Sequence, residues 1–132
     1  MTQLMPWEER FALGVPSMDG EHKELLRRMN DLYDLVGAGA PRPKVKAALE
    51  GLAEYTVDHF THEEKHMEAI GFPGLASHKL IHAQLLERFG GHADAFARGE
   101  PLGDAFFRFL KVWLASHICG VDRKYSPKAK AA

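Results

Sequence analysis

Histidines and acidic residues stand at helical spacing in several separate parts of this sequence. The densest cluster is the stretch HFTHEEKHM at positions 59–67. Imidazole and carboxylate groups are ligands of first-row transition metals. The same side chains also lie on solvated helix faces, where they bind nothing. The chain holds eight histidines, so the sequence can support metal binding if some of these groups face inward.

The helical rotation of about 100° per residue decides which members of this stretch face the interior. His59 and Glu63 fall within one sector of roughly 80° that also contains the apolar residues of the segment. Glu64 and His62 turn outward, and His66 lies roughly 60° from the centre of the sector. We therefore predict two buried ligands in this stretch, two outward-facing neighbours and one residue at the edge.

Five further candidates come from other parts of the chain. His78 and His82 are four positions apart and share a helix face with apolar residues. His117 continues the apolar face of the last periodic segment, and His22 lies near the start of the first. Asp122 follows a glycine that favours a helix end, after which the chain can turn this carboxylate inward. One buried histidine is usually a core residue. When several histidines and carboxylates converge in the interior, however, few arrangements other than metal binding give every polar group a partner.

Four periodic segments must position these residues, and each carries an apolar stripe at helical spacing. Breakers such as GAGAPRP and GEP separate them. The sequence predicts one domain over residues 1–132, with an arm at 1–17, helices at about 18–36, 43–70, 75–98 and 102–119, and a tail at 120–132. Short connections make neighbouring helices antiparallel, which predicts an all-α fold, an up-down-up-down four-helix bundle. The candidate ligands then meet at one end of the bundle.

The number and type of candidate ligands indicate a dinuclear site. Seven ligands are too many for one tetrahedral zinc ion, and the set contains no sulfur. Two carboxylates that can each span a pair of ions suit iron or manganese. Five histidines divide three and two, so that two carboxylate bridges and one oxygen bridge leave one metal six-coordinate and the other five-coordinate. Formal charges allow oxygen to bind at the five-coordinate metal without adding net charge to a buried pocket.

The bulk properties exclude several other classes of function. A formal net charge of -1 gives no broad electrostatic basis for binding nucleic acid or anionic membranes. The single cysteine excludes an internal disulfide framework. No segment is long and apolar enough to span a bilayer, and the N-terminal residues show no signal-peptide pattern. We therefore expect a cytoplasmic protein, and a monomer.

The motifs that carry the candidate ligands resemble those of the hemerythrins, specifically the single-domain bacteriohemerythrins. The matching stretches are MDGEH, HFTHEEKHM, HKLIH and WLASHICGVD, and the resemblance in their order and spacing extends over about residues 7–125. The resemblance implies a centre of two iron ions with an oxo or hydroxo bridge. It assigns His78, His82 and His117 to one iron, His22 and His59 to the other, and Glu63 and Asp122 as bridges. His62 and His66 are not ligands in this pattern.

The resemblance also implies an apolar oxygen pocket and a function. The pocket residues are Phe60, Trp113, Leu114 and Ile118, and dioxygen would bind at the iron with two histidines. We expect reversible oxygen binding for transport, storage or delivery in the cell, with an oxygen-consuming enzyme as a candidate recipient and no enzymatic activity. Two alternatives stay open: a sensor of oxygen or redox state, and a di-iron enzyme that handles peroxide or nitric oxide.

Overall fold

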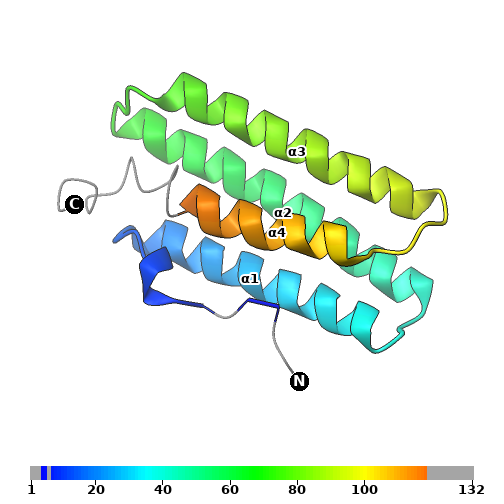
Figure 1. Cartoon of the computed structure of the whole chain (residues 1–132). Coiled ribbons are helices and arrows are strands. Elements are labelled where there is room, and N and C mark those ends of the chain that lie inside the picture. The colour runs from blue at the N-terminus through cyan, green and yellow to red at the C-terminus, as the bar shows by residue number, and fades with distance from the viewer. Residues whose placement is uncertain (1–3, 6, 119–132) are drawn as a thin grey trace.

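The computed structural model describes residues 4–5 and 7–118 and shows a bundle of four helices after a short arm. The elements are the 3-10 helix η1 (Glu9–Phe11), α1 (Pro16–Gly37), α2 (Arg42–Ala69), α3 (Leu75–Ala97) and α4 (Asp104–Ser116). Successive helices run in opposite directions (Figure 1). The described residues contain no strand, and the predicted all-α four-helix bundle is confirmed.

Local chemistry explains where the helices begin and end. α1 begins at Pro16, two residues before the predicted start, because proline at a first helical position loses no hydrogen bond that the helix would use. α2 ends before Gly71, which has a φ of 68°, a conformation that glycine adopts without steric cost. The N–H of Phe72 then donates to the carbonyl of Met67 at 2.9 Å, which closes the end of the helix. This tight turn places the start of α3 beside the end of α2.

The arm before α1 is fixed by two side chains of that helix. Asn30 is buried, accepts a hydrogen bond from the N–H of Met5 at 2.9 Å and donates one to its carbonyl at 3.0 Å. The carboxylate of Asp19 accepts from the N–H of Leu13 at 2.8 Å. Phe11 and Leu13 are both 0% exposed. The arm therefore contributes to the hydrophobic core.

One end of the bundle brings together the start of α1, the end of α2, the start of α3 and the end of α4 (left side of Figure 1). The regular part of α4 ends at Ser116, and the described chain continues to His117 and Ile118 in a wider helical turn. Among the described helices, none is long and apolar enough to cross a membrane.

Candidate metal centre

Six of the seven predicted ligands meet at this end of the bundle, and all six are buried. Their exposed fractions are 0% for His22 and Glu63, 1% for His59, 2% for His78 and His82, and 5% for His117. They come from α1, α2 and α3 and from the turn that follows α4. Burying this many polar groups is costly unless each finds a partner or a metal.

One oxygen of the Glu63 carboxylate faces the two histidines from α1 and α2. Oε2 lies 3.7 Å from Nε2 of His22 and 3.6 Å from Nε2 of His59. The two imidazole rings are 4.7 Å apart, measured between centroids, in an edge-to-face arrangement. These three side chains form one group of ligand atoms that lie within 4.8 Å of one another.

The other oxygen of Glu63 faces the three remaining histidines. Oε1 lies 3.1 Å from Nε2 of His78, 2.8 Å from Nε2 of His82 and 3.8 Å from Nε2 of His117. These four side chains form a second group within the same 4.8 Å limit. Among the residues that the structure describes, Glu63 is thus the one that the two groups share.

This geometry fits a pair of transition-metal ions. Nitrogen and oxygen ligands about 2.1 Å from an ion lie roughly 3 to 4 Å from one another, and the distances around Glu63 fall in or near that range. The donors are imidazole and carboxylate, which suit iron or manganese in such a site. The arrangement therefore fits two ions joined by the Glu63 carboxylate.

The protein keeps the central carboxylate ionised. Burial by itself would raise the pKa of Glu63, but hydrogen bonds from the surrounding imidazoles, with His117 and His22 foremost, outweigh it and hold the pKa well below its usual value. An ionised carboxylate has a free lone pair on each oxygen, which is what a bridging ligand needs.

Two carboxylates outside the predicted ligand set contact candidate ligands at Nδ1, the ring nitrogen that does not face Glu63. Glu21 Oε1 lies 2.7 Å from Nδ1 of His59, and Glu21 Oε2 lies 2.8 Å from Nδ1 of His62. Glu64 Oε2 lies 2.8 Å from Nδ1 of His82. Burial would raise the pKa of Glu21, but its hydrogen bonds with the two histidines outweigh burial and lower it. Glu21 was not among the predicted site residues, and Glu64 was predicted only to face outward.

The other residues of the dense stretch lie close to their expected positions. The His62 side chain is 54% exposed, as the helical rotation predicted, although it contacts Glu21. His66 is partly buried. Asp122, the seventh predicted ligand, lies outside the described residues, so its position as a second bridge stays a prediction.

The four apolar residues predicted for the oxygen pocket are all buried. Phe60 is 3% exposed, Trp113 6%, Leu114 2% and Ile118 0%. The Phe60 ring stacks on the imidazole of His82, with centroids 3.8 Å apart and planes 3° from parallel. It also meets Trp113 edge to face at 6.0 Å. An apolar side chain is therefore in direct contact with a candidate ligand.

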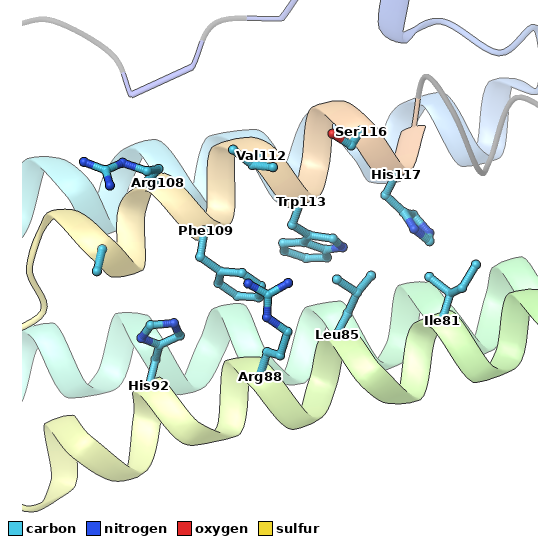
Figure 2. Close-up of a pocket in the computed structure, with 11 residues that line it drawn as sticks. Ile81, Leu85, Arg88, His92, Arg108, Phe109, Val112, Trp113, Ser116 and His117 are labelled. Atoms are coloured by element: carbon cyan, nitrogen blue, oxygen red, sulfur yellow. The ribbon is translucent and has the colours of Figure 1, made fainter.

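A groove between α3 and α4 extends from the candidate centre along the surface. Its volume is about 560 Å³. Figure 2 shows His117 and Ile81 at one end, and His92 and Arg108 at the other. Trp113 also lines it. The groove therefore reaches the edge of the candidate centre at His117.

A four-helix bundle that buries two histidine groups around one shared glutamate defines a class of dinuclear metal proteins. Comparison with known proteins identifies which family within that class. A family model described as the hemerythrin HHE cation binding domain matches residues 13–129. A bacteriohemerythrin of Stenotrophomonas maltophilia is 30% identical over 97% of this chain and 83% of its own length. A myohemerythrin of Riftia pachyptila is 34% identical over 90% of this chain and 88% of its own length.

Solved structures agree with these sequence matches. A crystal structure of wild-type hemerythrin matches with a TM-score of 0.87 at 32% identity, covering 94% of this chain and 96% of that chain. The structure of a hemerythrin L114A mutant matches with a TM-score of 0.89 at 30% identity, covering 96% and 97%. The chain belongs to the hemerythrin family. This is a family of oxygen-binding di-iron proteins, and the histidine and glutamate groups described above are able to hold metal ions.

Proposed function

We propose that this chain binds dioxygen reversibly at a di-iron centre and so carries, stores or delivers oxygen in the cell. In this proposal one iron takes His78, His82 and His117, and the other takes His22 and His59. Glu63 bridges the two, with Asp122 as the second bridge.

The observation that carries the proposal is the division of contacts at Glu63. Its Oε2 approaches two imidazoles, and its Oε1 approaches three others. A salt bridge alone does not require that the two oxygens of one carboxylate contact two separate groups of imidazoles. A three-and-two division would leave the iron held by His22 and His59 with fewer protein ligands and so with room for oxygen.

The chemistry divides between the cofactor and the chain. The di-iron centre, when bound, supplies the electrons that reversible oxygen binding requires. The chain holds the ligands in place and excludes water. Phe60 and Trp113 are buried beside the histidines, and an apolar lining of this kind withholds protons and water from a reactive ligand. By keeping proton donors away, this lining would slow the loss of bound oxygen as peroxide.

The polar residues near the centre favour binding over catalysis. Glu21 and Glu64 face the Nδ1 atoms of ligand imidazoles, and Glu63 lies between the two histidine groups. Each of these three carboxylates is therefore occupied, and none is placed to act as a general acid for cleaving an O–O bond. This arrangement supports a function in oxygen binding without enzymatic activity.

The test of this function is optical. The iron-loaded protein is reduced without oxygen, exposed to air, and then flushed with argon through several cycles. A carrier forms an oxygenated species that persists and loses its oxygen under argon, with the reduced spectrum recovered. Immediate oxidation to the ferric state, with no such species, would refute oxygen carriage and would favour a sensor or an enzyme.

The cellular setting belongs to the same proposal. We infer that the protein acts as a monomer in the cytoplasm and passes oxygen to an oxygen-consuming enzyme. Size-exclusion chromatography with light scattering checks the first point, with an expected mass near the 14.8 kDa of one chain. A stable mass of twice that value or more would contradict it.

A further inference from the structure

We propose that Glu21 and Glu64 are positioning residues of the di-iron centre, one for each iron, and that they make the ligand imidazoles stronger donors. The proposal rests on the ligand assignment above. Glu21 from α1 faces Nδ1 of His59 on α2 at 2.7 Å. Glu64 from α2 faces Nδ1 of His82 on α3 at 2.8 Å.

The burial of the two pairs is matched. The His59 and His82 side chains are 1% and 2% exposed, whereas the Glu21 and Glu64 side chains are 20% and 27% exposed. In each pair the imidazole is inside the bundle, and the carboxylate lies between it and the solvent. Each contact also crosses between neighbouring helices, so it fixes the rotation of the imidazole relative to the bundle.

The outer contacts place a hydrogen on Nδ1 of both rings. An ionised carboxylate only accepts hydrogen bonds, so Nδ1 must be the donor in both pairs. In both rings Nε2 is the atom that faces Glu63, at 3.6 Å for His59 and 2.8 Å for His82, and so it is the nitrogen that would bind a metal there. The outer carboxylates therefore keep Nδ1 as the donor and orient each ring so that Nε2 is the nitrogen that would bind metal.

The same contacts add negative charge behind the ligands. A carboxylate that accepts the Nδ1 hydrogen makes the opposite nitrogen more basic and stabilises the more highly charged state of the metal. One such carboxylate stands behind each group of ligands, so both irons are affected. Glu21 and Glu64 should therefore strengthen iron binding and lower the reduction potential of the centre.

The two carboxylates differ in one respect. Glu21 uses its second oxygen to contact Nδ1 of His62 at 2.8 Å, and the His62 side chain is 54% exposed. A surface histidine thus holds Glu21 in place from outside. We infer that His62 acts through Glu21 on the two-histidine iron alone.

The experiment compares Glu21→Gln, Glu64→Gln and His62→Ala with the wild-type protein. Glutamine keeps the size of the side chain and can still accept one hydrogen bond, but it carries no charge. Glu68→Gln is the matched control, because Glu68 lies on α2 one turn beyond Glu64 and is exposed. Each protein is loaded with ferrous iron without oxygen, and iron loss to a colorimetric chelator and the reduction potential are measured.

Each glutamine variant should lose one of its two irons about 10 to 100 times faster than the wild-type protein. The second iron should leave at a rate closer to that of the wild-type protein, so iron release becomes biphasic. The reduction potential should rise in both variants. His62→Ala should give a smaller change in the same direction, and Glu68→Gln should match the wild-type protein. Circular dichroism of the metal-free proteins checks that all of them remain folded, and a purely structural role would change thermal stability without changing the potential.

Failure of this inference is distinguishable from failure of the proposed function. If the wild-type protein and Glu68→Gln hold two irons, and the glutamine variants match them in iron release and potential, the positioning role is overturned and the centre stands. If a glutamine variant does not fold, His62→Ala still decides the case for Glu21, because it changes only an exposed side chain. Failure of the wild-type protein to hold two irons overturns both proposals.

Discussion

Replacing Phe60 with alanine tests whether the apolar lining is part of the rigid core around the ligands. The Phe60 ring is 3% exposed and lies between His82, which it stacks on at 3.8 Å, and Trp113 at 6.0 Å. Removing a buried phenylalanine side chain costs about 3 to 5 kcal/mol, from lost burial and from the cavity that remains. Domains of ordinary size have a total unfolding free energy of about 5 to 15 kcal/mol. The Phe60→Ala change therefore removes a large share of that free energy.

The measurement is thermal unfolding of the metal-free chain by circular dichroism, so that metal binding does not contribute. At roughly 4 °C per kcal/mol for a chain of intermediate size, Phe60→Ala should lower the Tm by about 12 to 20 °C. Phe60→Leu is the control, because it keeps much of the apolar volume and removes the aromatic contacts, which are worth about 0.5 to 1.5 kcal/mol. A Phe60→Ala loss below about 1 kcal/mol, or equal losses in the two variants, would refute the packing described for this residue.

Three further predictions follow from the site. Glu63→Ala and His82→Ala should each lose iron, measured by metal analysis, and a variant that kept two irons per chain would show the ligand assignment to be wrong. Leu114→Ala should speed conversion of the oxygenated protein to the ferric form, followed optically, because it opens the buried lining to water; an unchanged rate would mean that Leu114 does not protect bound oxygen. The pKa of Glu63 is lowered in the folded chain, so this carboxylate stabilises the metal-free fold at pH values above its unfolded pKa of about 4.5 and that stability is lost as the pH falls below it. Urea unfolding at pH 6 and at pH 4 should show the loss, and Glu63→Gln should flatten the difference.

The sequence predicted which residues of the dense stretch face the interior, because each helix has a fixed rotation per residue. That rotation placed His59 and Glu63 on the apolar face of their segment and turned His62 outward, and both residues of the inner pair are buried. The antiparallel order of four helices then brought His22 and His117 to the same end. These inferences need only the geometry of single helices and short connections.

The outer carboxylates could not be predicted in the same way. A rotation angle says where a residue points relative to its own helix, but not how far the neighbouring helix is turned toward it. Glu64 lies off the buried face of α2, yet the packing of α3 brings Nδ1 of His82 to 2.8 Å from its carboxylate. Glu21 likewise contacts two histidines of the next helix. Such contacts depend on the packing of helix pairs, which a one-dimensional pattern does not contain.

The start of the first helix shows a smaller limit of the same kind. The apolar period predicts a start near Met18, but α1 begins at Pro16. Pro16 fell within the predicted arm at residues 1–17, whereas proline is favoured at a first helical position. Whether a proline ends one segment or begins the next depends on the backbone around it.

The most direct test of the metal centre is the number of irons that the chain binds. Ferrous iron is titrated into the metal-free protein without oxygen, and bound iron is counted per chain after removal of the excess. A carboxylate shared by two histidine groups predicts two irons per chain, with His59→Ala losing iron from the two-histidine position first. Saturation at one iron per chain, or no binding, would contradict the dinuclear centre.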